Sequence, residues 1–157
     1  MDATATTNPN PAPAADDLQA RRSQTVQDHM RLELAGDLDG VLATFATPRY
    51  EVNGPGVDYD GRDAVLGYFA DWRRSYPDQG GELISMRQAD DAIVCEFWIT
   101  GTNTGPLEVN GKTLPPTGKS FKIRALAVFE FAPGQDKLAC ERVYFDTNAI
   151  WTQIGVA

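Results

Sequence analysis

The chain has 157 residues, of which 42% are hydrophobic and 10% aromatic, and its formal net charge is -8. This length and composition predict one globular domain with a well-filled core. The negative charge repels phosphate backbones and anionic lipids, and no apolar run is long enough to span a membrane. The sequence therefore argues against nucleic-acid and membrane partners.

The residues that most often bind metals are scarce. Cys95 and Cys140 both lie in predicted strands and lack metal-ligand spacing, so we expect buried free thiols in a reducing cytoplasm. One His and two separated Cys residues argue against a His/Cys metal site, and we expect no metal.

The chain divides into a leader, residues 1–15, and one domain, residues 16–157. The leader is rich in Ala, Thr, Pro and Asn and is expected to be disordered. A helix should then follow, with an apolar stripe at multiples of four residues that includes Val26, Met30 and Leu34 and ends at Gly36. His29 borders this stripe. We expect it to be solvated or locally hydrogen-bonded, in preference to a ligand or proton carrier.

Two more helices are expected in the first half of the chain. A short one follows Asp37 and contains Val41 and Leu42, and a strand covers residues 50–53. The third helix, residues 62–75, has apolar and aromatic residues at the spacing of one helical face.

The second half of the chain has the period of strands. Strands are predicted at residues 82–88, 92–100, 120–132 and 138–146, followed by a short terminal helix. The connection 103–118 contains Asn110-Gly111, which favours a tight hairpin turn. Its length leaves open whether it is a lid over a site or an ornamented loop. Helices followed by hairpin-connected strands predict an α+β domain, with helices on one face of an antiparallel sheet.

Several short segments carry a family resemblance through their order and spacing. They are Gly36-Asp37-Leu38-Asp39, Gly61-Arg62-Asp63-Ala64-Val65, Tyr76-Pro77-Asp78, Thr100-Gly101-Thr102-Asn103-Thr104-Gly105, Pro115-Pro116-Thr117-Gly118, Tyr144-Phe145-Asp146 and Gln153-Ile154-Gly155. With them, residues 18–155 resemble the SnoaL-like polyketide cyclases, which have the nuclear transport factor 2-like and ketosteroid-isomerase-like fold. The resemblance implies a cone-shaped curved antiparallel sheet around N-terminal helices, an apolar pocket, no cofactor, and a homodimer formed through the outer sheet face.

The chain also departs from the family pattern. Asn103 stands where the family often has His, and the strand 120–132 lacks the His that the cyclases use. Arg142 stands where many relatives have an aromatic residue.

The predicted catalytic residues are Asp146 and Tyr144. Asp146 matches the family's aspartate base at the end of the last strand. In an apolar pocket a carboxylate becomes a stronger base, able to take a proton from carbon beside a carbonyl, and Tyr144 could donate to the resulting enolate. Asp146 also precedes a helix, so its alternative role is a helix cap.

The predicted substrate-binding residues are of two kinds. The polar candidates are Arg124, Arg142 and Asn103, and Arg124 could instead pair with Glu96 or Glu141 across strands. The apolar candidates, which could equally be core, are Trp98, Trp72, Phe69 and Tyr50.

These residues and the resemblance predict a cofactor-independent enzyme of natural product biosynthesis. It would abstract a proton from a hydrophobic polyketide-like or polycyclic small molecule, as an aldol cyclase or isomerase. The alternatives are a non-catalytic domain that binds a small ligand or a protein, and an epoxide hydrolase.

Overall fold

The computed structural model describes residues 15–156. The predicted leader, residues 1–15, lies outside them except for Ala15, which begins the first helix. The elements are α1 (Ala15–Ala35), α2 (Leu38–Ala43), β1 (Arg49–Val52), β2 (Val57–Asp60), α3 (Arg62–Ser75), β3 (Gly80–Gln88), β4 (Ala92–Thr102), β5 (Leu107–Val109), β6 (Lys112–Leu114), β7 (Ser120–Phe131), β8 (Leu138–Tyr144) and α4 (Thr147–Ile154).

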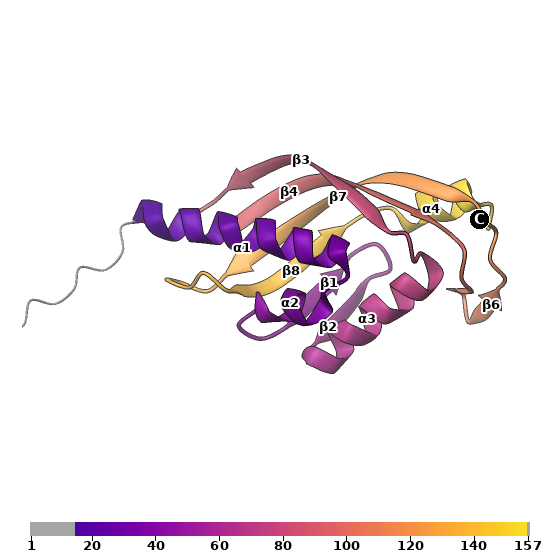
Figure 1. Ribbon diagram of the computed structural model, residues 1–157, viewed down its shortest axis with the longest axis horizontal. Helices are drawn as coiled ribbons and strands as arrows, with labels where there is room; N and C mark the ends of the chain where they lie inside the picture. Colours follow the sequence, from indigo (N-terminus) through magenta and orange to yellow (C-terminus); the bar gives the residue numbers. More distant parts are fainter. Residues whose placement is uncertain (1–14, 157) are drawn as a thin grey trace, which may run out of the picture.

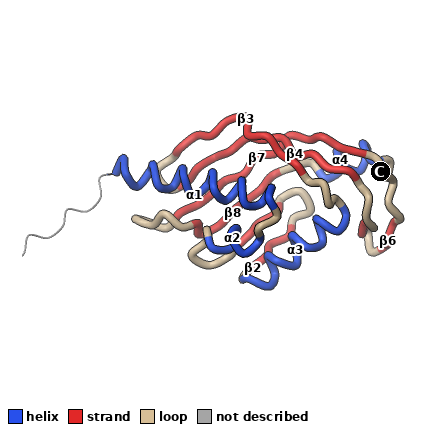
Figure 2. Tube along the Cα trace, viewed as in Figure 1, coloured by secondary structure: helices blue, strands red, loops and turns tan. Residues whose placement is uncertain are grey.

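Six strands form one sheet in the order β2-β1-β8-β7-β4-β3. The prediction of an α+β fold is confirmed, with one difference in strand direction. β1 pairs with β8 in parallel, while the other pairs in this sheet are antiparallel. A hairpin cannot make a parallel pair, and here α3 and several strands lie between the two partners along the chain. Figure 1 shows β1 beside β8, and Figure 2 colours the same view by secondary structure.

Helices α1, α2 and α3 cover one face of the sheet (Figure 1). The core lies between these two layers. It joins Val26 of α1, Val41 of α2 and Phe69 of α3 to inward-facing sheet residues such as Ile93 and Phe129. Alternate residues of β7 are buried, as expected for a strand with one covered face.

One buried cation fixes α1 across the ends of two hairpins. The Arg22 guanidinium donates hydrogen bonds to Asp90 O in the β3–β4 turn at 2.8 Å, and to Ala132 O and Gln135 O after β7 at 3.0 and 2.8 Å. It also lies over the Phe131 ring, 4.8 Å from its centroid. These contacts set where the N-terminal half of α1 meets the sheet.

The predicted loop 103–118 contains a small hairpin, β5–β6, that is separate from the main sheet. Asn110 and Gly111 have φ angles of 51° and 74°, so the predicted Asn-Gly turn is confirmed. β2 was not predicted, and β8 ends at Tyr144, two residues earlier than expected.

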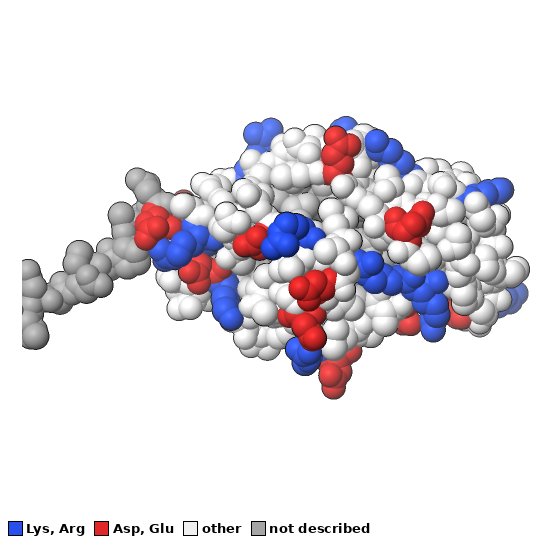
Figure 3. All heavy atoms as spheres, viewed as in Figure 1, with Lys and Arg blue, Asp and Glu red and all other residues white. Residues whose placement is uncertain are grey.

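No helix among the described residues is long and apolar enough to cross a membrane. On the face drawn in Figure 3, acidic and basic side chains are interspersed, and neither sign forms one large patch.

Candidate functional site

A cavity of about 330 Å³ lies between the C-terminal half of α1 and strands β3 and β4. Its wall is mostly apolar and includes three carboxyl groups: Glu33 from α1, Glu141 from β8 and the exposed Glu82 from β3. The residues that line it are Gln27, Met30, Arg31, Glu33, Leu34, Gln79, Gly80, Gly81, Glu82, Leu83, Phe97, Trp98, Ile99, Phe129 and Glu141.

A smaller cavity of about 30 Å³ continues this space into the core. It shares Glu33, Gln79, Phe97 and Ile99 with the larger cavity, and adds Tyr50 and Tyr68. Glu33 therefore faces both spaces.

The two carboxyl groups meet a buried histidine. His29 Nε2 lies 2.8 Å from Glu141 Oε2 and 3.9 Å from Glu33 Oε2. The His29 and Glu141 side chains are only 0% and 2% exposed, and that of Glu33 is 18% exposed. Burying polar groups in this way requires that they satisfy one another.

Each member of this His29–Glu33–Glu141 cluster is also held from behind. Tyr50 donates its hydroxyl hydrogen to Glu141 Oε1 at 2.8 Å, and Gln79 Nε2 donates to Glu33 Oε1 at 3.2 Å. His29 Nδ1 lies 2.8 Å from the Thr44 hydroxyl. The atoms that remain, one from each residue, lie within 4.8 Å of one another.

Burial and charge shift the pKa values of the cluster. Burial and, after it, the charge of Glu141 raise the pKa of Glu33 from 4.5 to about 7, while His29, Gln79 and Arg73 act in the opposite direction. For His29, burial lowers the pKa, but the facing carboxylates of Glu141 and Glu33 outweigh it, so the pKa is raised. Glu33 is thus a carboxyl group that exchanges its proton near neutral pH.

The same three atoms are the candidate metal ligands among the described residues. In a tetrahedral zinc site with bonds of 2.0–2.1 Å, ligand atoms stand about 3.3 Å apart. His29 Nε2 and Glu141 Oε2 are closer than this, at 2.8 Å, and Glu33 is farther, at 3.9 Å. These separations suit a shared proton better than zinc.

Asp146 lies outside both cavities. Its side chain is exposed and accepts hydrogen bonds from the backbone N–H groups of Asn148 and Ala149, at 2.9 and 3.2 Å. It is the N-cap of α4. The expectation that Asp146 faces an apolar chamber is therefore wrong, because β8 ends at Tyr144 and the chain turns into α4.

The other polar candidates also lie away from the cavities. Tyr144 is 43% exposed. Arg124 pairs with Glu96 at 3.2 Å, one of the alternatives left open for it.

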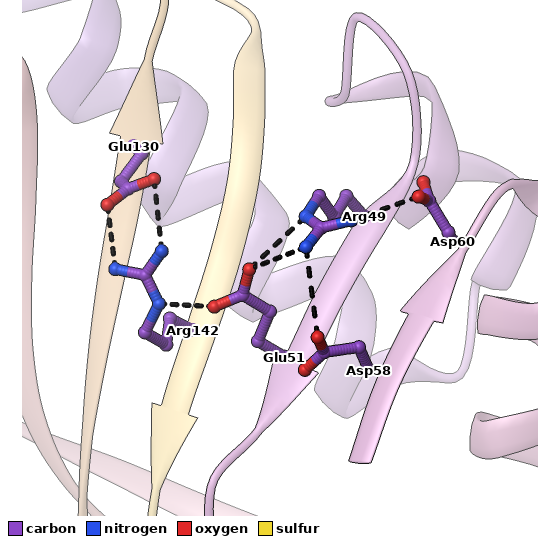
Figure 4. Close-up of polar contacts among 6 residues, drawn as sticks. All are labelled: Arg49, Glu51, Asp58, Asp60, Glu130 and Arg142. Carbon is purple, nitrogen blue, oxygen red and sulfur yellow. Dashed lines mark hydrogen bonds and ion pairs between the residues drawn. The ribbon is translucent and has the colours of Figure 1, made fainter. Parts of the chain in front are cut away.

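Arg142 lies on the outer sheet face between Glu130 of β7 and Glu51 of β1 (Figure 4). Glu51 also contacts Arg49, which reaches Asp60 of β2 at 2.9 Å. Hydrogen bonds from Arg142 lower the pKa of Glu51 below its ordinary range. Arg142 is thus committed to ion pairs and does not contact Asp146.

Asn103 is fully buried but binds backbone. Its amide donates to Gly105 O at 2.9 Å and to Ser75 O at 3.4 Å, and its oxygen accepts from Thr117 N at 2.9 Å. It therefore fixes the loop after β4 against the end of α3.

The aromatic candidates lie closer to the site. Tyr50, Phe69 and Trp72 line the small cavity. Trp98 contributes to the wall of the large cavity, while its ring stacks with Lys122 and Arg124, whose charged groups lie 4.7 and 4.8 Å from its centroid.

The sequence interpretation missed the cluster itself. Its signal on α1 is that Arg22, Val26, His29 and Glu33 share one helical stripe, so His29 is fully buried instead of solvated. Its signal on β8 is that Glu141 alternates with Arg142 and so shares the inward face with Val143. A charged residue at a sequence position whose periodicity predicts burial indicates a group that is paired or functional.

Solved structures with this architecture include enzymes and proteins without an assigned role. A proposed SnoaL-like polyketide cyclase from Jannaschia sp. CCS1 superposes with a TM-score of 0.75 at 18% identity, over 97% of this chain and 99% of that one. A hypothetical protein with a ketosteroid isomerase-like fold from Catenulispora acidiphila, solved with trimethylamine, gives 0.70 at 13% identity, over 85% and 94%. SalBIII, an epoxide hydrolase/cyclase-like enzyme of salinomycin pyran ring formation, gives 0.67 at 21%, over 84% and 95%.

At these identities the likeness shows the shared fold. No curated protein sequence matches the chain. The SnoaL-like domain model matches residues 26–139, which include His29, Glu33 and most of the sheet. The chain belongs to the SnoaL-like domain family.

Proposed function

We propose that this protein is an enzyme that moves a proton on an apolar, polyketide-like small molecule, with Glu33 as the proton acceptor. The observation that carries the proposal is the pair of buried carboxyl groups, Glu33 and Glu141, at the wall of an apolar cavity. Two carboxylates so close in an apolar site cannot both ionise easily, so one retains a proton. Such a pair supplies an acid and a base side by side.

The chemistry follows from the position of Glu33. Its Oε2 takes a proton from a carbon next to a carbonyl group, and the electrons of that C–H bond move to the carbonyl oxygen as an enolate. The enolate carbon then attacks a second carbonyl, which gives aldol cyclisation, or is reprotonated elsewhere, which gives isomerisation. Tyr68, which lines the same small cavity as Glu33, is a candidate donor to the enolate oxygen.

The surroundings favour an apolar substrate. Phe97, Ile99, Phe129 and Met30 are among the apolar residues of the wall, and the volume of about 330 Å³ is within the range of small-molecule sites. The likeness to a proposed polyketide cyclase supports the same substrate class. We also propose a homodimer formed through the outer face of the sheet.

The experiment follows proton exchange at carbon, which needs no knowledge of the product. In deuterated buffer, 1-tetralone exchanges its protons next to the carbonyl, and NMR measures the rate. We expect the protein to accelerate this exchange and Glu33→Gln to lower the rate by at least about 100-fold, the usual contribution of a general base.

Glu82→Gln is the matched control, because Glu82 lines the same cavity but is exposed. It should retain the wild-type rate. Exchange no faster than in buffer with 1-tetralone, anthrone and a decalone would contradict the proposal, as would full activity in Glu33→Gln. Binding of these ketones without exchange would instead support the non-catalytic alternative.

A second candidate function is epoxide hydrolysis, favoured by the likeness to SalBIII. The same pair would then act on water: Glu33 takes a proton from the water that attacks the epoxide carbon, and the acid partner protonates the leaving oxygen. Hydrolysis of styrene oxide that is lost in Glu33→Gln, with no exchange on ketones, would establish this reading.

A further inference from the structure

The Thr44 hydroxyl lies between a carbonyl oxygen and a ring nitrogen at the back of the cluster. It is 2.6 Å from Val41 O and 2.8 Å from His29 Nδ1. A hydroxyl group carries one hydrogen, and a carbonyl oxygen can only accept. The hydrogen of Thr44 is therefore committed to Val41 O, and the hydroxyl oxygen must accept a hydrogen from His29 Nδ1.

That assignment fixes the other side of the ring. With a hydrogen on Nδ1, the neutral imidazole has a lone pair on Nε2, which lies 2.8 Å from Glu141 Oε2. Neither atom has another hydrogen-bond partner among the described residues. Two lone pairs at that distance repel each other, so a proton lies between them, on Nε2 or on Oε2.

The rest of the surroundings cannot replace Thr44. The rings of Phe45 and Phe129 pack edge-on against His29, with centroids 5.3 and 5.5 Å away. The other oxygen of Glu141 already accepts from Tyr50. Thr44 lines neither the larger nor the smaller cavity.

We propose that Thr44 is a positioning residue that holds His29 in the Nδ1–H form, so that the His29–Glu141 pair keeps one shared proton at the cavity wall. The consequence for chemistry rests on the proposed function. As Glu33 removes a proton from the substrate carbon, the shared proton passes through Glu141 Oε2 to the substrate oxygen. His29 is left as the neutral Nδ1–H form and Glu141 as a carboxylate.

The charged and titratable groups that face His29 are few. Glu33 lies on its own helix, Glu141 comes from β8, and Tyr50 of β1 acts through Glu141. Loss of the Thr44 hydroxyl removes the acceptor for Nδ1–H without changing any of these charges.

The chain contains a single histidine, so NMR of ¹⁵N-labelled protein reports on His29 without overlap. In the wild type, Nδ1 should carry a hydrogen on both sides of the titration, and the Nε2 signal should show the shared proton. Thr44→Val, which keeps the shape and removes the hydroxyl, should lower the His29 titration midpoint by about one pH unit or more. Thr44→Ser should restore the wild-type spectrum.

Thr147→Val is the control, because Thr147 is another threonine whose hydroxyl is buried, but far from His29 in the fold. It should leave the His29 signals unchanged. The wild-type protein alone also tests the assignment, because a spectrum in which His29 Nδ1 carries no hydrogen would overturn it. An unchanged spectrum in folded Thr44→Val would do the same.

The activity readout separates this proposal from the proposed function. In ketone exchange, Thr44→Val should lower kcat by at least about tenfold with little change in KM, and Thr44→Ser should recover it. If the wild type shows no exchange but the spectra behave as expected, the proposed function fails and the role of Thr44 stands. Normal kcat in Thr44→Val would overturn the proton-delivery role.

Discussion

At the scale of single residues, the same chemical group has opposite surroundings at two positions. Asp146 is exposed and satisfied by backbone N–H groups, while Glu33 faces a cavity and has a pKa raised to about 7 by burial. The difference comes from the surroundings of each carboxyl group, because an ionised group is stable where water or N–H donors reach it. Residue type alone did not distinguish a cap from a base.

The cap predicts a modest loss of stability on truncation. Asp146→Ala should lower the free energy of unfolding by about 1 kcal/mol, because two N–H groups of α4 lose their acceptor. Asp146→Asn should change it little, since Asn also caps helices. Urea unfolding measures both, and ketone exchange should be unaffected in either variant. A loss of exchange in Asp146→Asn with normal stability would restore Asp146 as the base.

Glu33 predicts how stability depends on pH. Its pKa is about 7 in the folded protein against 4.5 as the ordinary value. Between these values the folded state binds more protons than the unfolded state, so the free energy of unfolding falls as pH rises. The fall due to Glu33 should be up to about 3 kcal/mol between about pH 5 and about pH 8.

Urea unfolding of the wild type and Glu33→Gln across this range measures the effect. The raised pKa of His29 acts in the same direction, because its stabilisation is lost as pH rises through the folded value. The larger causes of this shift, the charge and hydrogen bond of Glu141, remain in Glu33→Gln, so most of the difference between the two proteins comes from Glu33. Parallel curves for the two proteins would show that Glu33 does not titrate as described.

At the scale of elements, α1 is the part of the fold on which the site depends. It carries His29 and Glu33, and Arg22 attaches it to the turns after β3 and β7. The buried face of this helix is largely polar, which is why its apolar pattern is weak. Its place on the sheet depends on a charged group as much as on apolar contact.

Loss of the Arg22 contacts should therefore destabilise the whole protein. Arg22→Met keeps much of the side-chain volume but removes three hydrogen bonds and leaves Asp90 O and Gln135 O without a donor, so we expect a loss of about 3 kcal/mol. Chemical unfolding measures it. Arg31→Met, at an exposed position of the same helix, should stay within about 0.5 kcal/mol of the wild type. Equal effects of the two substitutions would contradict the role of Arg22.

At the scale of the whole molecule, the two faces of the sheet differ in character. The inner face packs against helices and encloses the cavities, while the outer face combines ion pairs such as Arg142–Glu130 with exposed apolar residues. Leu126 and Tyr144 are neighbours across β7 and β8 and are 37% and 43% exposed. Exposed apolar groups surrounded by charged ones are typical of an interface between subunits that also fold on their own.

The proposed homodimer can be tested at these residues. Sedimentation should give the mass of two chains for the wild type and of one chain for Leu126→Glu, because the substitution buries an unpaired charge in the interface. Leu34→Glu, which changes an exposed leucine on α1, should remain a dimer. A wild type that sediments as one chain at micromolar concentration would contradict the dimer.

The sequence by itself determined the fold class and the order of most elements. Periods of 3.6 and 2 residues, the Asn110-Gly111 turn and the spacing of short motifs are local properties of the chain, so they can be read without coordinates. The aromatic lining of the cavities follows in the same way, since Phe69 and Trp72 belong to a regular helical stripe.

Only the tertiary structure decided the site. Tyr50 meets Glu141 because β1 and β8 pair in parallel, with these two residues opposite each other, and no local pattern encodes that register. His29 and Glu33 come close to Tyr50 and Glu141 only when α1 packs on the sheet. The end of β8 at Tyr144 likewise made Asp146 a cap. The environment of a charged group, which sets its proton affinity, is assembled from segments distant in the chain, and so it exists only in the folded molecule.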